Sequence, residues 1–283
     1  MDHDKDDLLA RAIAGSADIS AALSAADVMP EPPPPPPGQV TLPGGLPRGG
    51  KVHRTAVVRE LNGSDEEALS KALASGSLFR FMDTLIERGT EMIGDLPATR
   101  ELLKTLLIGD RDELAVAIRI ATYGDEVVIE GWQCPHCQGM SDISFSLAED
   151  VGRRVLDDPA ADGVFDVALR KGAKVRVRLP NGEDQDALFE NPEWTAAQRN
   201  TVLLSRCVMT YTGPDGQDVN IRAFPRMVLD LSIPDRQAVI SQVAKRQPGP
   251  RYNEVKFTHA ECGKQVVLAL GVTDLFRDLI AFL

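Results

Sequence analysis

Two short ligand pairs carry the residue types and the spacing of a metal site. The first is Cys134-Pro-His-Cys137 and the second is His259-Ala-Glu-Cys262. A spacing of two residues lets one tight turn present two ligands to one ion, and three thiolates with one imidazole suit a tetrahedral zinc site. Because the pairs lie far apart in the sequence, a shared ion would join distant parts of the fold. We therefore predict that Cys134, Cys137, His259 and Cys262 bind a structural Zn2+.

Other chemistry fits these residues less well. A redox Cys-x-x-Cys pair opens a helix, whereas strand-like residues follow Cys137. A catalytic zinc ion keeps an open position for water, and four protein ligands leave none. If His259 is an ordinary surface histidine, Cys207 remains as a fourth ligand, although its apolar surroundings favour a place in the core. We expect His136 to point outward from its turn.

The elements that must position the ligands are strands on both sides of each pair. These strand-like residues are 127–132 and 143–147 around the first pair, and 254–258 and 266–270 around the second. The apolar positions that follow each pair have the same parity, so the apolar faces lie on the same side of both turns. This repetition predicts two β-knuckles that face one another, with Trp132 and Phe257 packed beside the metal.

Composition divides the chain into three parts. Residues 1–51 combine a short helical face with six consecutive prolines and a glycine-rich stretch, which predicts a disordered Pro/Gly-rich arm. Residues 52–125 begin with a strand and continue as a mainly helical subdomain, whose last helix we expect Asp110 to cap. Residues 126–283 form a β-rich zinc-knuckle domain.

A β-hairpin and helices are predicted as an insertion between the two knuckles. The hairpin covers residues 165–179, and helices follow at about 193–208 and 233–245. After the second knuckle comes a short helix whose apolar stripe comprises Leu275, Phe276, Leu279, Ile280 and Leu283. The fold class is therefore α+β: a zinc-ribbon-like pair of β-knuckles with an inserted hairpin and helices, preceded by a disordered arm.

Charge and composition argue against several classes of protein. The net charge of −11 disfavours a general nucleic-acid binder, and the basic stretch from Arg170 to Arg178 is better explained as a protected sheet edge. Four cysteines are too few for a disulfide framework and indicate metal binding in a reducing compartment. The acidic N-terminus is not typical of a signal peptide, and no apolar run has the length of a membrane span. We expect a cytoplasmic protein that contacts no membrane.

Five further segments accompany the ligand pairs in a fixed order: VVRELNGSDEE at 57–67, LLIGDRD at 106–112, ATYGDEV at 121–127, RLPNGEDQ at 178–185 and KRQPGPR at 245–251. Together with the pairs, over about residues 52–283, they resemble the T-even-like baseplate and tail-assembly proteins of contractile-tailed bacteriophages. In that family the second knuckle typically carries Cys-x-x-Cys. Here His259 takes the first of those positions, and imidazole is an acceptable zinc ligand.

The resemblance implies a non-enzymatic structural or assembly protein, a hub component or a chaperone, of a phage contractile tail baseplate. Its implied partners are other phage tail and baseplate proteins, reached through the N-terminal arm and the C-terminal helix, unless that helix simply closes its own core. Its implied location is the host cytoplasm during assembly and the tail of the virion. The alternative from another class is a zinc-ribbon nucleic-acid-binding or regulatory protein, and the absence of local catalytic motifs speaks against an enzyme.

Overall fold

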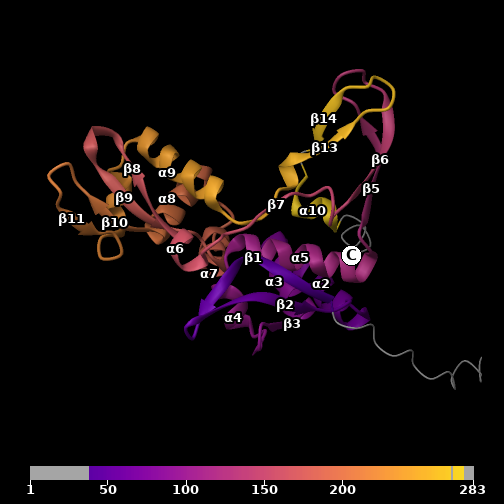
Figure 1. The fold of residues 1–283 in the computed structure, drawn as a ribbon, viewed down its shortest axis with the longest axis horizontal. Coiled ribbons are helices and arrows are strands. Elements are labelled where there is room, and N and C mark those ends of the chain that lie inside the picture. Colours follow the sequence, from indigo (N-terminus) through magenta and orange to yellow (C-terminus); the bar gives the residue numbers. More distant parts are fainter. Residues whose placement is uncertain (1–37, 269, 277–283) are drawn as a thin grey trace, which may run out of the picture. The chain divides into compact units, whose positions relative to one another are not determined.

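The computed structural model describes residues 38–268 and 270–276. It confirms a mixed fold of helices and sheets, and every strand pair among the described residues is antiparallel (Figure 1). None of the described helices is long and apolar enough to cross a membrane.

The first part of the fold is a small sheet covered by helices. Its elements are β1 (Gly38–Arg48), β2 (Lys51–Val58), α2 (Gly63–Leu73), α3 (Leu78–Gly89), β3 (Thr90–Ile93), β4 (Leu96–Pro97), α4 (Arg100–Thr105) and α5 (Ile108–Tyr123). The strands pair in the order β1-β2-β3-β4. Helix α5 lies against β1 and contributes Leu114, Val116 and Ile118 to the larger of two hydrophobic cores.

Strand β1 corrects the prediction that the disordered arm reaches residue 51. Residues 38–48 are extended, as their prolines and glycines indicate, but they pair with β2 and bury Leu42 and Leu46. The apolar side chains that point into the core decide the outcome, because their burial offsets the entropy lost on ordering. Residues 1–37, including the predicted short helical face, lie outside the described residues.

Asp110 has a different role from the predicted helix cap. It lies in the first turn of α5, where its Oδ1 accepts the backbone N–H groups of Gly44 and Gly45 in β1, at 2.6 and 3.4 Å. The side chain is fully buried, and burial raises the pKa of this carboxyl group to about 7. Asp110 therefore joins two elements that are far apart in the sequence.

The start of α5 is capped from a distant segment. Its N-cap residue, Leu107, forms no side-chain capping bond. The side-chain amide of Gln247 is oriented with its oxygen towards the first residues of α5. That oxygen accepts hydrogen bonds from the N–H groups of Ile108 and Gly109, at 3.2 and 2.9 Å. A Cβ atom on Gly109 would lie 1.6 Å from the Pro248 carbonyl oxygen, so only glycine permits this approach. The segment KRQPGPR is thus packed against the first residues of α5.

The insertion between the knuckles contains the predicted hairpin and helices and has a hydrophobic core of its own. Its elements are β7 (Arg153–Arg154), α6 (Pro159–Asp162), β8 (Val164–Ala168), η1 (Arg170–Gly172), β9 (Lys174–Arg178), α7 (Gly182–Phe189), α8 (Ala196–Cys207), β10 (Val208–Thr212), β11 (Asp218–Asn220), η2 (Pro225–Leu229), α9 (Ile233–Arg246) and β12 (Gly249–Pro250). The sheet order is β11-β10-β9-β8. Its second core includes Val175, Val177 and Val239. The insertion begins and ends side by side, because β7 pairs with β12.

The basic strand of the hairpin, β9, is not the sheet edge that its charges predicted, because it pairs with β8 on one side and β10 on the other. Acidic neighbours neutralise part of its charge instead. Lys174 and Arg176 each lie within 4 Å of Asp166 on the paired strand, at 3.5 and 3.7 Å. Arg178 makes two hydrogen bonds, of 2.6 and 2.8 Å, to the buried carboxylate of Asp184. These ion pairs leave less free positive charge on the hairpin than its sequence indicates, which weakens the case for a nucleic-acid surface there.

The short C-terminal helix α10 (Val272–Leu275) closes the larger core instead of presenting its stripe to solvent. Leu275 and Phe276 are buried in that core, and the Phe276 ring meets Phe81 edge to face at 6.1 Å between centroids. The other three residues of the predicted stripe lie outside the described residues. At its first two positions, then, the stripe packs in its own fold and is not free to dock elsewhere.

Candidate metal centre

Two β-hairpins carry the four predicted ligands and bring them together. Strands β5 (Glu126–Gln133) and β6 (Met140–Ser146) form the first, and β13 (Val255–Thr258), preceded by η3 (Tyr252–Glu254), pairs with β14 (Gln265–Leu268) in the second. Their ends lie side by side in Figure 1 although they are far apart in the sequence. The roots of both hairpins, including Val127, Phe145, Val255 and Leu268, are buried in the larger core. That core, not the ligands alone, places the turns opposite one another.

The first turn has the hydrogen bonds of a tight knuckle. The Cys134 N–H donates to the Gly139 carbonyl at 2.9 Å, and the Gln138 N–H donates to the Cys134 carbonyl at 2.9 Å. Gln138 has a φ of +63°, a left-handed conformation that is uncommon for a residue with a side chain.

The second turn repeats this pattern position by position. The His259 N–H donates to the Lys264 carbonyl at 2.9 Å, and the Gly263 N–H donates to the His259 carbonyl at 2.8 Å. Gly263 has a φ of +65° and takes the place that Gln138 has in the first turn. The repetition predicted from strand parity therefore extends to the backbone of the turns, and His259 occupies the position of Cys134.

The ligand atoms of Cys134, Cys137, His259 and Cys262 all lie within 4.8 Å of one another. Cys134 Sγ lies 3.9 Å from Cys262 Sγ, and His259 Nδ1 lies 3.5 Å from Cys137 Sγ and 3.3 Å from Cys262 Sγ. Usual zinc–ligand bond lengths at a tetrahedral angle give edges of about 3.8 Å between two sulfurs and about 3.6 Å between sulfur and nitrogen. The four donors thus have the spacing of a tetrahedral site.

Electrostatic conditions at the thiols also suit a cation. Burial acts to raise the pKa of Cys134, but the backbone N–H groups of Cys137 and His136 point at its sulfur and hold the pKa below its usual value. At Cys137 the Gly139 N–H favours the thiolate, but desolvation and the adjacent thiols outweigh it and raise the pKa. Closely spaced thiolates repel one another, and a bound cation would relieve that repulsion.

His259 is held in place by aromatic packing. The imidazole is buried, with 1 % of the residue exposed, and its Nε2 has no hydrogen-bond partner within the described part of the chain. The Trp132 ring lies 6.1 Å from the imidazole and 5.0 Å from the Phe257 ring, between centroids. Both aromatics therefore pack beside the cluster, as predicted, and fix the ring with Nδ1 towards the thiols.

The other candidate residues stay apart from this centre. Cys207 is buried in the second core, where burial raises the pKa of its thiol to about 12, so the fourth-ligand alternative fails. His136 is exposed at the tip of its turn, as expected. Sequence reasoning missed Gly139, whose Cβ would lie 2.0 Å from a carboxylate oxygen of Glu261 in the opposite knuckle. The available signal was a glycine within two residues after the second ligand of each pair, Gly139 and Gly263, although the two positions are not equivalent in the turns.

Chemically, the cluster offers a four-coordinate site with no position left for water or substrate. An ion with all four positions filled by protein can stabilise a fold but cannot activate a water molecule. Two turns from hairpins that are remote in the sequence supply the ligands, so an ion bound here would tie them together.

Comparison with known proteins adds the family. The model of the T4 bacteriophage base plate protein family matches residues 39–277, which is most of the chain. The comparisons with curated proteins and with solved structures found no match to this chain. The match covers both ligand pairs, the insertion and both hydrophobic cores. The chain belongs to the T4 bacteriophage base plate protein family.

Proposed function

We propose that this protein is a non-enzymatic structural or assembly component, a hub subunit or a chaperone, of a phage contractile tail baseplate. The family match supports the tail role. The observation that carries the non-enzymatic part is the cluster of three cysteines and one histidine, whose four donors leave no open position. Its function then lies in the surfaces that the fold presents to other tail proteins.

Zinc is the ion proposed for Cys134, Cys137, His259 and Cys262. Three thiolates and one imidazole at tetrahedral spacing are a donor set that favours zinc over the harder ions magnesium and calcium. The ion would supply folding free energy by joining the two knuckles, which in isolated zinc-finger peptides amounts to about 10 kcal/mol or more.

Metal content of two cysteine variants tests the zinc proposal. Cys262→Ser should abolish stoichiometric zinc, whereas Cys207→Ala, which removes a thiol from the second core, should retain it. Elemental analysis of both purified proteins gives the answer. If Cys262→Ser is insoluble, a chelator added to the wild-type protein should lower its melting temperature, and a melting temperature that stays unchanged after zinc removal overturns the structural role.

Proteins that accompany this one during assembly test the baseplate proposal. We expect the protein in the host cytoplasm while tails assemble and, if it is a hub subunit, in the finished virion as well. Tagged protein purified from phage-producing cells should carry baseplate, hub or tail-tube proteins at fixed stoichiometry. Mass spectrometry of purified virions then separates a hub subunit, which is present, from a chaperone, which is absent. Recovery of nucleic acid or transcription proteins instead would overturn the proposal in favour of a regulatory zinc ribbon.

A further inference from the structure

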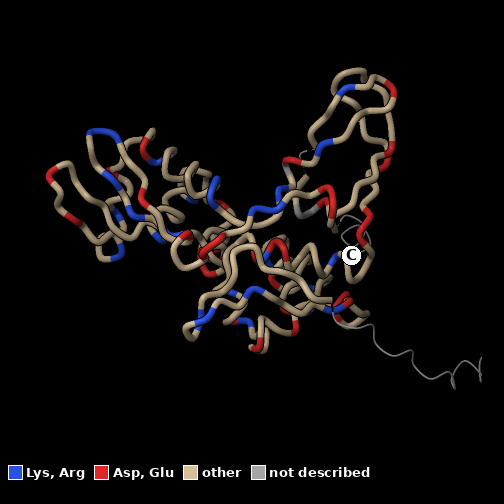
Figure 2. Tube along the Cα trace, in the orientation of Figure 1, with Lys and Arg blue, Asp and Glu red and all other residues tan. Residues whose placement is uncertain are grey.

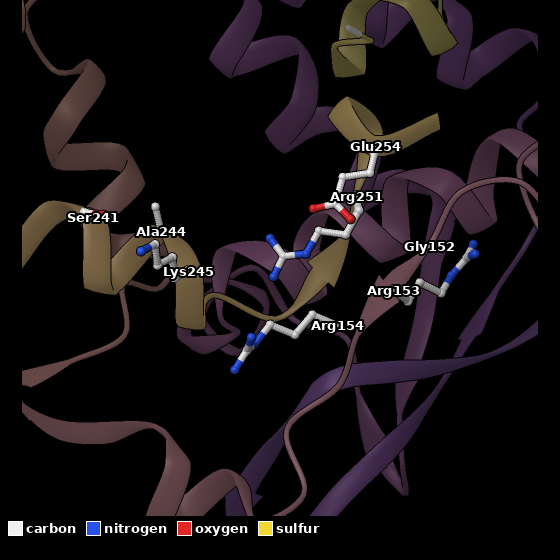
Figure 3. A pocket seen from close by; sticks show the side chains of 8 residues that line it. All are labelled: Gly152, Arg153, Arg154, Ser241, Ala244, Lys245, Arg251 and Glu254. Carbon is white, nitrogen blue, oxygen red and sulfur yellow. The ribbon is translucent and has the colours of Figure 1, made fainter. Parts of the chain in front are cut away.

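A cleft of about 640 Å3 lies where the insertion begins and ends, and we call it the basic cleft. It is lined by β7, by the last turns of α9 and by the segment after β12 (Figure 3). Its cationic residues are Arg153, Arg154, Lys245 and Arg251. The two cationic segments, 153–154 and 245–251, are about ninety residues apart in the sequence. Part of the lining belongs to the KRQPGPR segment, for which the metal centre provides no role.

Strand pairing divides two consecutive arginines between the core and the cleft. In the β7–β12 pair, Arg153 lies opposite Pro250 and Arg154 lies opposite Gly249. Both residues border the cleft, but neighbouring side chains of a strand point to opposite faces, so only one of the two guanidinium groups can point into it. Arg153 points away and bonds to the buried carboxylate of Glu113 at 2.8 and 3.0 Å (Figure 3).

Arg251 continues this ladder and lies on the same face as Arg154. Its N–H donates to the Gly152 carbonyl at 2.7 Å, which extends the pairing by one step. Its Nη2 donates to the Gln247 carbonyl at 2.9 Å, and this bond uses one of the five N–H donors of the guanidinium group. The side chain is thereby held in place with most of its donors still available.

Lys245 completes the cluster from the side of α9. Ser241, Ala244 and Lys245 are spaced three and four residues apart, so they share one helical face, and all three line the cleft. Within the residues that the structure describes, neither Arg154 nor Lys245 has an ion-pair partner. The lining thus gathers unpaired positive charge in a chain whose net charge is −11.

We propose that the basic cleft binds an acidic, carboxylate-rich segment of a neighbouring tail protein. Two arginines can each take a carboxylate through paired N–H donors, and Lys245 adds a less directional charge. A nucleic acid fits less well, because its phosphate backbone needs an extended basic surface, whereas the positive charge here is confined to the cleft and acidic and basic positions are mixed over most elements (Figure 2). This inference rests on the proposed role in tail assembly.

Peptide binding by the full-length protein tests the cleft directly. The probe is a fluorescent oligoglutamate peptide, compared with an oligoglutamine peptide and an oligothymidylate. We expect salt-sensitive binding of oligoglutamate, weakened roughly tenfold or more in a triple variant with Arg154, Lys245 and Arg251 changed to alanine. The matched control removes the same charge from exposed positions elsewhere, at Arg48, Lys171 and Arg222, and should bind as the wild type does.

Each outcome separates this inference from the proposed function. If both triple variants bind alike, if the wild type does not bind oligoglutamate, or if oligothymidylate is bound more tightly through the same three residues, the acidic-segment inference is overturned. Purification of tail proteins with the wild type, but not with the cleft variant, supports both proposals. Unchanged recovery with the cleft variant leaves the baseplate role standing and refutes the cleft, whereas no recovery with the wild type refutes the baseplate role.

Discussion

Replacing Asp110 with asparagine should remove a pH dependence of stability that the contact between α5 and β1 imposes. The Asp110 side chain is fully buried, and its Oδ2 has no hydrogen-bond partner within the described residues. Burial is the main cause that raises its pKa from 3.8 to about 7, and the N–H groups of Gly44 and Gly45 oppose this shift without cancelling it. Asparagine offers the same oxygen acceptor to both groups and has no titratable proton.

The sign follows from proton binding. Because the folded pKa lies above the unfolded value, the folded state holds more protons between them, and the free energy of unfolding falls as pH rises. The contribution is complete below the unfolded pKa and is lost as pH rises through the folded value. With the two values above, the wild type loses about 2–3 kcal/mol between about pH 5 and about pH 8 through Asp110 alone.

Urea unfolding of wild type and Asp110→Asn at both pH values measures this difference. Burial also raises the pKa of Glu113, and acid weakens any bound metal, but these effects are common to both proteins and cancel in the comparison. The variant leaves amide hydrogens unpaired and can be less stable than the wild type at low pH. The test is therefore how the difference in free energy of unfolding between wild type and variant changes from the lower to the higher pH. Asp157→Asn, at an exposed position, serves as the control. If the stability of Asp110→Asn falls with pH as steeply as that of the wild type, the reasoning is refuted.

Three further predictions concern the turns of the metal centre and the close packing at the start of α5. His259→Cys should retain one metal ion per chain, because the two turns share their hydrogen bonds and a set of four thiolates suits zinc; elemental analysis that finds no metal contradicts this. Gln138→Gly should raise the free energy of unfolding by about 0.5–1 kcal/mol by relieving a positive φ, and Gly263→Ala should lower it by a similar amount, as urea titrations would measure. Gly109→Ala should cost about 3 kcal/mol or more in the same assay, because its Cβ would meet a backbone oxygen 1.6 Å away, whereas Gly152→Ala, whose nearest neighbour is 4.0 Å away, should be nearly neutral; equal effects of the two would contradict the packing argument.

Local sequence patterns predicted many elements of the fold, because a hairpin or a helix start is determined mainly by residues that are close together in the sequence. The hairpin around Lys171 and the helix that follows Ser232 were expected and are present, as β8–β9 and α9. Alternating apolar residues specify a strand, and a serine before a helical stripe specifies a helix start, without help from the rest of the fold. Helix α2 begins in the same local way, because Asn62 caps it in a capping box with Asp65.

Predictions failed where the structure of a residue depends on contacts with residues far away in the sequence. The composition of residues 38–51 indicated disorder, but β2 and α5 provide the surfaces that order them. Asp184 belongs to an acidic stretch in which nothing marks one residue for burial, yet its side chain is buried, where Arg206, 22 residues further along, pairs with it together with Arg178. A local sequence pattern cannot predict such contacts, because they form between elements that come together only in the folded chain.

The sequence by itself determined the donor set, Cys134, Cys137, His259 and Cys262, because ligand chemistry and a two-residue spacing are properties of short segments. It also determined the matching parity of the strands that follow each pair. The tertiary structure alone decided that the four donors meet within 4.8 Å, because a common hydrophobic core holds the roots of both hairpins. It decided as well that Arg153 bonds to Glu113 while Arg154 faces the basic cleft. Strand pairing made that choice between two adjacent and chemically identical residues, and it depends on contacts made across the whole insertion.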